Sequence, residues 1–346
     1  MGETAVTPSS HSAPNAPNTP EPLRLAVVIP CYRVRGHIAS VLRRIGPEVW
    51  RIYCVDDGCP DQSRSVIEEC AAADSRIRCI VHERNQGVGA AVVTGYRQAL
   101  EDGADLIVKV DGDGQMDPAL IPQVVEPLAD FDADYVKGNR FFHIEGLRSM
   151  PTIRLIGNAG LSFMSKISTG YWTLFDPTNG FTAIHASVAR QLPLGKLSPR
   201  YFFESDILFR LNTLRAVVAE VPMNARYADE KSNLNLSRAL IEFPVRHARN
   251  GLKRIFYNYF LRGFGVASIN LVCGLLLLAF GVVFGGIEWA TAAERNVPAS
   301  SGTVMLAALP VIVGSQLLLS FLSFDMANVP RDPICRKARR REHRGP

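Results

Sequence analysis

Two long uncharged segments near the C-terminus constrain this chain most. Residues 264–287 and residues 302–324 contain no Asp, Glu, Lys or Arg. About 20 consecutive apolar residues cross the hydrocarbon core of a bilayer, and a buried helix of a globular domain seldom runs that far without a charge. We therefore expect a two-span transmembrane hairpin over residues 263–326. A pair of buried core helices is the alternative interpretation.

Basic residues flank this hairpin and predict its orientation. Residues 238–262 hold six Lys or Arg against one acid, and residues 331–346 hold seven against two, whereas the connecting loop, residues 288–301, holds one Arg and two Glu. Lys and Arg concentrate in cytoplasmic loops. We therefore expect an integral protein of a cytoplasmic or inner membrane, with both termini in the cytoplasm. The net charge of +5 then reflects a bilayer partner. A nucleic acid bound by the terminal RKARRRE run is the rival interpretation, and we expect no such partner.

The rest of the chain divides by composition. Residues 1–22 are rich in Pro, Ser, Asn and Thr and lack the apolar core of a secretory signal, so we expect a disordered leader. Residues 23–235 have the composition of one globular domain. Residues 236–262 are basic, aromatic and amphipathic, which is typical of helices on a bilayer surface. Residues 327–346 are expected to be a basic cytoplasmic tail. The seven cysteines show no metal-site spacing and are interpreted as small buried hydrophobes.

Strand and helix signals alternate through the first half of the domain. The expected strands are residues 25–30, 50–57, 77–81 and 105–110, and the expected helices are residues 36–45, 61–73, 87–100, 152–167 and 203–215. This rhythm predicts a mainly parallel sheet with helices on both faces. Such sheets bind ligands beyond the carboxyl ends of their strands. Polar motifs at residues 30–32, 56–58 and 111–113 lie at those ends.

The motif Asp111-Gly-Asp113-Gly-Gln115 carries the strongest chemical signal. Two carboxylates and a carboxamide from one tight turn are oxygen ligands that suit Mg²⁺ or Mn²⁺. Such an ion would also bind a diphosphate and neutralise its charge as it leaves. A plain glycine-rich turn is the alternative. A Ca²⁺ loop is excluded, because Met116 replaces the required Gly and Pro122 the bidentate Glu.

At this point several motifs together carry a family resemblance. They are VVIPCYR (27–33), VDDGCPDQS (55–63), NQGVGAA (85–91), DGDGQMDP (111–118), KGNR (137–140) and FDPTNGFTAI (175–184). The chain resembles family 2 glycosyltransferases of the GT-A fold, and more narrowly the branch of dolichyl-phosphate mannosyltransferase and the bacterial polyprenyl-phosphate glycosyltransferases. The resemblance covers about residues 24–235 and the two-helix anchor. It implies an α/β GT-A nucleotide-diphospho-sugar transferase fold, followed by interfacial helices and two transmembrane helices.

The resemblance also implies roles for particular residues. Nucleotide-sugar binding would fall to Pro30, Tyr32, Asp57, Asn85, Asp111, Arg226 and Lys231. Asp111, Asp113 and Gln115 would hold the metal, and Arg140 would meet the sugar diphosphate or the lipid phosphate. The chain departs from the family at Arg33, where Asn is usual, and in the spacing around Lys231. The Gly-rich run at residues 85–89 is not a dinucleotide fingerprint, because Val92 stands where a third Gly or Ala belongs.

The acids Glu204 and Asp206 open an expected helix and leave two roles open. In many relatives an acid here is the general base, and the spacing to Arg210 aligns Glu204 with that base. Alternatively, both acids complement the positive end of the helix dipole. A phosphate acceptor is already ionised, so either acid could instead position the acceptor or the sugar hydroxyls.

Together these features predict one activity. We expect inverting transfer of a hexose from a GDP- or UDP-linked donor to a polyprenyl or dolichyl phosphate at the cytoplasmic membrane face. Alternatives are a glycosyltransferase with another lipid or glycan acceptor, and a non-catalytic membrane scaffold that keeps the domain. A homo-oligomer is compatible with the sequence.

Overall fold

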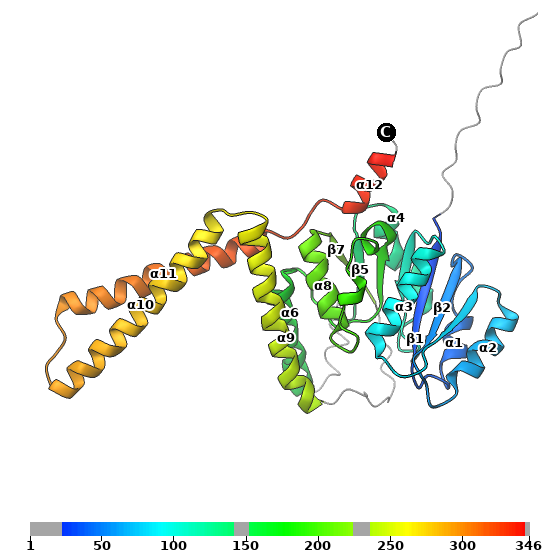
Figure 1. Ribbon diagram of the computed structural model, residues 1–346, viewed down its shortest axis with the longest axis horizontal. Helices are drawn as coiled ribbons and strands as arrows, with labels where there is room; N and C mark the ends of the chain where they lie inside the picture. The colour runs from blue at the N-terminus through cyan, green and yellow to red at the C-terminus, as the bar shows by residue number, and fades with distance from the viewer. Residues whose placement is uncertain (1–22, 142–151, 224–235, 343–346) are drawn as a thin grey trace, which may run out of the picture.

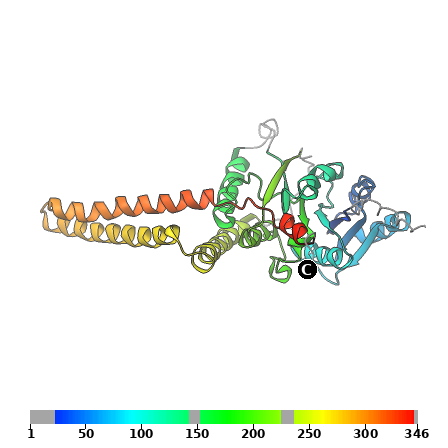
Figure 2. The same ribbon diagram turned by 90° about the horizontal axis from the view of Figure 1, so that it is seen from above.

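The computed structural model describes residues 23–141, 152–223 and 236–342. The expected leader and the residues Arg226 and Lys231 lie outside this part of the chain. Figure 1 shows an α/β domain from which a long helical hairpin projects to one side, and Figure 2 shows the same hairpin from above.

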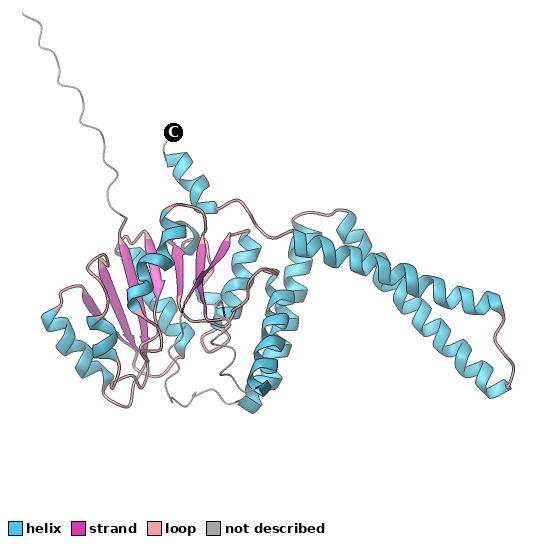
Figure 3. Ribbon diagram, turned by 180° about the vertical axis from the view of Figure 1, so that it is seen from behind, coloured by secondary structure: helices cyan, strands magenta, loops and turns pink. Residues whose placement is uncertain are grey.

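Seven strands form one sheet in the order β3-β2-β1-β4-β6-β5-β7. They are β1 (Leu25–Cys31), β2 (Arg51–Asp56), β3 (Ile77–Val81), β4 (Leu106–Lys109), β5 (Tyr135–Asn139), β6 (Thr182–His185) and β7 (Val218–Pro222). Only β6 runs antiparallel to its neighbours, β4 and β5; every other pair is parallel. The expected mainly parallel GT-A-like sheet is therefore confirmed. Figure 3 shows its strands in magenta with the cyan helices around them.

Helices cover both faces of the sheet, as a parallel sheet requires. One face carries α1 (Ile38–Arg43), α2 (Ser63–Ala73) and α4 (Ile121–Ala129), and the other carries α3 (Val88–Glu101), α7 (Ala186–Ala189) and α8 (Phe203–Leu214). Short 3₁₀ turns lie at Pro118–Leu120 and Leu194–Lys196. Along β1 the side chains alternate between the two cores: Leu25, Val27 and Ile29 face one, while Ala26 and Val28 face the other. This burial on both faces explains the unbroken apolar run that predicted the strand.

Two further helices lie between the domain and the hairpin. α6 (Thr152–Thr169) packs against α9 (Leu236–Phe256), which continues into a π-helical turn, η3 (Tyr257–Leu261). Figure 1 shows α6 and α9 side by side. Large apolar side chains stay exposed on them, including Phe163 on α6 and Leu252 and Phe256 on α9. α9 therefore presents exposed apolar side chains in the segment expected to be interfacial, and α6, which was expected within the globular domain, presents Phe163 beside it.

The hairpin consists of α10 (Val266–Arg295) and α11 (Ser301–Ala327), both long and apolar enough to cross a membrane. Of the most apolar stretch of each helix, 22% in α10 and 11% in α11 is buried. The two helices are therefore not core helices of the domain. They pack closely on one another: a Cβ on Gly314 would lie 2.8 Å from the backbone nitrogen of Leu278. Small residues at such contacts are typical of packed membrane helices.

The expected basic tail is partly ordered against the domain. Residues Ile334–Glu342 form α12, and the backbone N–H groups of Ile334 and Cys335 donate to the buried carboxylate of Asp134 at 2.9 and 2.8 Å. Val329 and Ile334 pack against the core that contains α3 and α8. The chain thus returns from the hairpin to the sheet.

Candidate active site

The Asp111–Gln115 turn follows β4 at the carboxyl end of the parallel strands, where the sequence predicts it. Its three oxygen-bearing side chains are half-buried. Oδ1 of Asp113 accepts a hydrogen bond from the backbone N–H of Gln115 at 3.0 Å. Gly114 has a φ of +78°, a conformation that side chains with a Cβ rarely adopt. Local backbone geometry therefore holds both carboxylates on one tight turn.

Directly beneath this turn, the buried ammonium of Lys109 joins three elements. Its Nζ donates to Oδ1 of Asp111 at 2.7 Å and to the carbonyl of Gly180 at 3.0 Å, and lies 3.4 Å from Oε1 of Glu204. Burial alone would lower the pKa of Lys109, but Asp111 and Glu204 outweigh it and raise the pKa above its ordinary value. Lys109 therefore stays charged and links the aspartate turn to α8.

Gly180 leaves the room that this arrangement needs. A Cβ at this position would lie 2.3 Å from Oδ2 of Asp111 and 2.6 Å from Nζ of Lys109. Any larger residue would displace one of the two charged groups. The NGF part of the 175–184 motif is therefore explained by close packing beside the aspartate turn.

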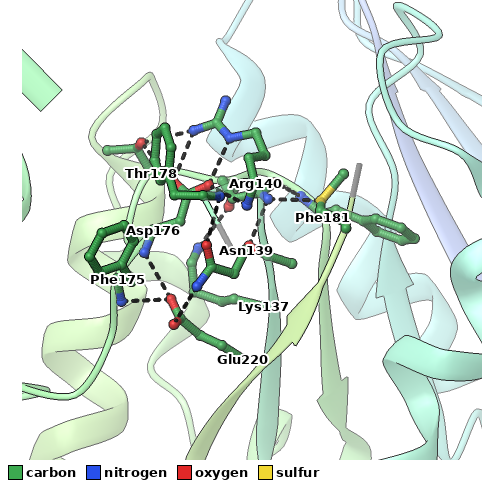
Figure 4. A network of polar contacts seen from close by, with 12 residues as sticks. Lys137, Asn139, Arg140, Phe175, Asp176, Thr178, Phe181 and Glu220 are labelled. Atoms are coloured by element: carbon green, nitrogen blue, oxygen red, sulfur yellow. Dashed lines mark hydrogen bonds and ion pairs between the residues drawn. The ribbon is translucent and has the colours of Figure 1, made fainter. Parts of the chain in front are cut away.

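Arg140 lies at the end of β5 in a network of polar contacts (Figure 4). Its Nε and one terminal nitrogen donate to the two carboxylate oxygens of Asp176 at 2.7 and 2.9 Å. Asp176 is fully buried, while the Arg140 side chain is 28% exposed. Such a bidentate pair fixes the plane of the guanidinium. Arg140 is thus held in a fixed orientation while its side chain stays partly exposed.

Glu220 on β7 and Lys137 on β5 complete this network. Glu220 accepts the backbone N–H groups of Phe175 and Asp176, both at 2.8 Å, and the carboxamide of Asn139 at 3.0 Å. Burial raises the pKa of Glu220. Lys137 donates to the carbonyl of Asn179 at 2.7 Å, and burial lowers its pKa to about 8.

The KGNR and DPTNGF motifs, far apart in the sequence, are therefore one structural unit (Figure 4).

On the other side of the sheet centre, Asp57 braces a loop. Its carboxylate accepts the backbone N–H groups of Gln86 and Gly87 at 2.8 and 2.7 Å and contacts Nδ1 of His82 at 2.8 Å. The loop contains Asn85 and opens α3. Asp57 is 2% exposed, so these contacts support the loop, and direct contact of Asp57 with a nucleotide stays a prediction.

Pro30 is a buried residue near the end of β1, and the half-buried Tyr32 follows the strand. The backbone N–H of Asp57 donates to the carbonyl of Cys31 at 3.0 Å, so the strand ends that carry these residues lie together. The departure at Arg33 lies here too: its φ is 58°, and its guanidinium lies over the Tyr32 ring at 5.4 Å.

The two acids of α8 lie in different surroundings. Glu204 faces Lys109 and the aspartate turn. Asp206 is 6% exposed and accepts from the backbone of Ser198 at 3.0 Å, Asn250 at 3.1 Å and Arg210 at 3.2 Å. These contacts join α8 to α9. The structure thus brings Glu204 to the site, whereas the contacts of Asp206 explain it as structural and its catalytic role stays a prediction.

Comparison with known proteins agrees with this geometry. Residues 26–192 match the profile described as Glycosyl transferase family 2. This segment of the chain is therefore a family 2 glycosyl transferase domain. It is similar in fold to mannosyl-3-phosphoglycerate synthase from Rubrobacter xylanophilus, with a TM-score of 0.51 and 18% identity over 67% of this chain and 74% of that one. It is also similar to glucosyl-3-phosphoglycerate synthase from Mycobacterium tuberculosis, with a TM-score of 0.50 and 21% identity over 67% and 80%.

Among curated relatives, two transferases share 29% identity with the chain. One is the UDP-N-acetylglucosamine–dolichyl-phosphate N-acetylglucosaminyltransferase of Methanococcus voltae, matched over 63% of this chain and 92% of the relative. The other is the undecaprenyl-phosphate mannosyltransferase of Micrococcus luteus, matched over 58% and 83%. The resemblance to this branch of family 2 is therefore confirmed at the level of distant homology.

The family 2 domain offers a metal an open site. Among the residues that the structure describes, no three His, Cys, Asp or Glu side chains form a metal-binding group. An ion at the aspartate turn would therefore take its other ligands from Gln115, water and a diphosphate. Mg²⁺ commonly binds in this way, with few protein carboxylates. The oxygen donors of Asp111, Asp113 and Gln115 fit such an ion.

Sequence reasoning missed three residues of the family 2 site. Lys109, Asp176 and Glu220 hold Asp111, Arg140 and the 175–181 loop in place. A signal for the first was present, since Lys109 interrupts an otherwise apolar buried strand immediately before the aspartate turn. Asp176 stands in the 175–184 motif, which carries the resemblance but suggests no role for it. Glu220 lies in a short strand, where no pattern distinguishes it.

Proposed function

We propose that this chain transfers a hexose, with inversion, from a GDP- or UDP-linked donor to a polyprenyl or dolichyl phosphate at the cytoplasmic face of a membrane. The observation that carries the proposal is the coexistence of two features in one chain: an aspartate turn on a family 2 sheet and an exposed apolar hairpin. Relatives named for transfer to dolichyl and undecaprenyl phosphate support it.

The donor would lie along the carboxyl edge of the parallel strands. Pro30, Tyr32 and the 85–87 loop braced by Asp57 would bind the nucleoside, and Arg226 and Lys231 would close on the diphosphate. A divalent ion on Asp111, Asp113 and Gln115 would neutralise charge on the leaving diphosphate. Lys109 holds Asp111 in the orientation that this role needs.

The acceptor would be a lipid phosphate held by Arg140. Its oxygen would attack the anomeric carbon on the face opposite the diphosphate, the glycosyl–diphosphate bond would break, and the nucleoside diphosphate would leave. One displacement inverts the anomeric centre. Because this nucleophile is already ionised, it needs a cationic clamp more than a base. Asp176 fixes such a clamp in place.

A hydroxyl acceptor on another lipid or a glycan is the second candidate, because Glu204 lies beside the aspartate turn where a general base would act. The hydroxyl proton would then pass to Glu204 during attack, a contribution of roughly 10²–10⁴-fold in rate. The engagement of Glu204 with Lys109 favours a positioning role and hence the phosphate acceptor.

Membrane anchoring is part of the proposal. α10 and α11 are exposed along most of their length, and basic residues flank the pair. We place the loop between them outside and the family 2 domain inside.

The test uses the full chain reconstituted in liposomes with Mg²⁺ or Mn²⁺. A panel of labelled nucleotide-sugars is offered with a polyprenyl phosphate, the matching polyprenol and diacylglycerol, and lipid products are identified by mass spectrometry. We expect a glycosyl phosphate of the polyprenyl chain with one donor. Product from polyprenol or diacylglycerol alone would establish the second candidate. Binding without turnover of any donor would favour the scaffold and contradict the proposal.

A further inference from the structure

One carboxylate at the cytoplasmic end of α11 collects donors from three other segments. Oδ1 of Asp325 accepts from Nη1 of Arg254 and from the hydroxyl of Tyr259, both at 2.6 Å. Oδ2 accepts from Nη2 of Arg254 at 3.0 Å and from Nε1 of Trp172 at 2.8 Å. We call these four residues the Asp325 clamp. The side chains of Arg254 and Asp325 are each 3% exposed.

The clamp is built into the surrounding backbone. Arg254 belongs to α9 and also donates to the carbonyl of Ile167 in α6 at 2.9 Å. Gly170 has a φ of +76°, and a Cβ there would lie 2.7 Å from the Arg254 guanidinium. The chain after α6 therefore leaves space for Arg254. Asp325 is the first charged residue after the long uncharged segment of α11, so it lies at the end of the proposed span.

Beyond the clamp, the chain is tied to the family 2 domain twice more. Arg215, at the end of α8, donates to the backbone carbonyl and side-chain oxygen of Asn328 at 2.8 and 3.1 Å. Asp134 then accepts the backbone of Ile334 and Cys335. The hairpin itself packs mainly helix on helix. The orientation of the domain relative to the hairpin is therefore set by the contacts at the end of α11 together with those of η3 at the start of α10.

A buried charged pair contributes more to fixing the relative orientation of the segments it joins than to their net stability. Removing two charges from water is costly, and apolar residues of the same volume often stabilise equally well. What a bidentate Arg–carboxylate pair adds is a fixed distance and a fixed plane. Two further donors on the same carboxylate leave it little freedom to rotate.

The site lies far from this clamp. Figure 1 shows α9 ending at the hairpin, with its start at the same end of the molecule as the carboxyl ends of the parallel strands. A helix of this length spans about 30 Å. Small tilts at the clamp are therefore magnified at the aspartate turn. Misplacement of reacting groups by about 1 Å can cost roughly 10²-fold in rate.

We propose that Asp325 is a positioning residue: the clamp fixes the height and tilt of the family 2 domain over the bilayer, and so brings the phosphate of an embedded lipid to the donor. This inference rests on the proposed function. It requires that transfer to an acceptor confined to the bilayer depend on the clamp. Transfer to a water-soluble acceptor of the same chemistry should not depend on it.

The experiment compares two acceptors with the full chain in liposomes. One is a long-chain polyprenyl phosphate in the bilayer, and the other is a short-chain, water-soluble prenyl phosphate. Asp325→Asn keeps the shape of the side chain and removes its charge, and Trp172→Phe removes one donor. Asp332→Asn is the matched control, because this acid on the same connecting segment is 83% exposed.

We expect Asp325→Asn to lower kcat/KM for the embedded acceptor by roughly 10²-fold, and to change kcat and both KM values with the soluble acceptor by less than about twofold. The kcat/KM of Trp172→Phe for the embedded acceptor should lie between the values of wild type and Asp325→Asn. The kcat/KM of Asp332→Asn should equal that of wild type. Equal losses with both acceptors, or no loss with either, would overturn the proposal.

A second readout is independent of turnover. Energy transfer from a fluorophore on α2, at Glu69→Cys, to a dye in the lipid headgroups reports the height of the domain. Asp325→Asn should broaden this distance distribution, and Asp332→Asn should leave it unchanged. An unchanged distribution in Asp325→Asn would overturn the proposal even in a protein with no transferase activity, whereas inactivity of the wild type would count against the proposed function alone.

Discussion

Two arginine–aspartate pairs, each joined by two hydrogen bonds, lie in different parts of this molecule. Arg140 and Asp176 meet beside the aspartate turn, and Arg254 and Asp325 meet where the hairpin joins the domain. In each pair, two nitrogens of the arginine contact the two oxygens of the aspartate. The pairs differ in geometry, because Arg140 donates through Nε and Nη2 and Arg254 through Nη1 and Nη2. They also differ in exposure: the Arg140 side chain is 28% exposed and that of Arg254 is 3%.

This difference separates two uses of one interaction. At the site the carboxylate is buried and the arginine side chain is partly exposed, so the aspartate fixes the orientation of a cation that solvent can reach. In the clamp both groups are sealed, so the pair has no capacity for a ligand and can only join elements. Exposure thus separates the arginine proposed to bind a ligand from the arginine that joins elements.

The largest expected effect comes from a change that leaves both pairs intact. Asp113→Ala should lower turnover by roughly 10³-fold, because the metal supplies several kcal/mol of charge stabilisation, while the thermal midpoint stays near that of wild type. Transfer assays with and without chelator check this, and added Mg²⁺ or Mn²⁺ should restore the chelated wild type. Full activity in excess chelator would refute the metal assignment.

Conservative replacement of each arginine tests the comparison itself. Lysine keeps the charge but loses the planar fork. Arg140→Lys should lower kcat/KM for the acceptor by roughly 10²-fold, with a small change in thermal midpoint. Arg254→Lys should leave transfer to a soluble acceptor within about twofold and lower the thermal midpoint, because the buried Asp325 loses bonds that cost about 1–3 kcal/mol to leave unmade. Identical behaviour of the two variants would show that exposure does not separate their roles.

A smaller effect is expected at Gly180. Gly180→Ala places a methyl group against Asp111 and Lys109, and such overpacking costs about 1–3 kcal/mol. We expect activity to fall by roughly tenfold, with apparent metal affinity reduced in titrations. Gly36→Ala is the control, because a Cβ at Gly36 would meet nothing within 4 Å. Matching losses in both variants would point to a general effect of alanine.

Glu204→Gln distinguishes the acceptors with a milder expected change. For a phosphate acceptor, transfer should fall less than about tenfold, since Lys109 keeps its bond to Asp111 and no base is needed. The pH–rate profile should show no essential base near neutrality. A loss of 10²–10⁴-fold, the usual worth of a general base, would instead support a hydroxyl acceptor.

The smallest effect concerns pH and the buried Lys137. Its folded pKa of about 8 lies below its unfolded value because of burial, so between pH 8 and about 10 the unfolded chain binds more protons and folding gains stability as pH rises. Lys137→Met should therefore be more stable than wild type near pH 7, and this advantage should shrink by pH 9. Thermal midpoints in detergent at the two values measure it. A stability advantage of Lys137→Met that grows with pH would contradict the expected direction of this pH dependence.

The first part of the fold was predictable because a strand that is buried on both faces has a continuous run of apolar residues in the sequence. β1 to β4 are apolar runs bounded by turn residues, and the aspartate turn follows from the rule that ligands bind at carboxyl ends. β5, β6 and β7 were not predicted. They are short, and residues such as Lys137 and Asn139 interrupt their patterns while being buried by contacts with distant segments.

The site was predictable in its exposed members and not in its supports. Asp111, Asp113, Arg140 and Glu204 stand in motifs, and the structure brings them to one edge of the sheet. Lys109, Asp176 and Asp325 act through partners that only the fold brings near.

Asp206 shows the converse. It occupies a motif position that suggested a catalytic acid, but its carboxylate accepts hydrogen bonds that join α8 to neighbouring segments. The docking of the basic tail was likewise not predicted, because its bonds to the buried Asp134 come from backbone N–H groups, which every sequence has.

The return of the chain to Asp134 has a consequence for how the protein is made. A ribosome completes the residues of the sheet before it makes either span, yet two of the three backbone N–H groups on the buried Asp134 carboxylate come from residues 334 and 335, after both spans. Val329 and Ile334 also fill part of the core against α3 and α8. Assembly of the sheet domain therefore needs a segment that is synthesised after both spans, once the hairpin has turned back.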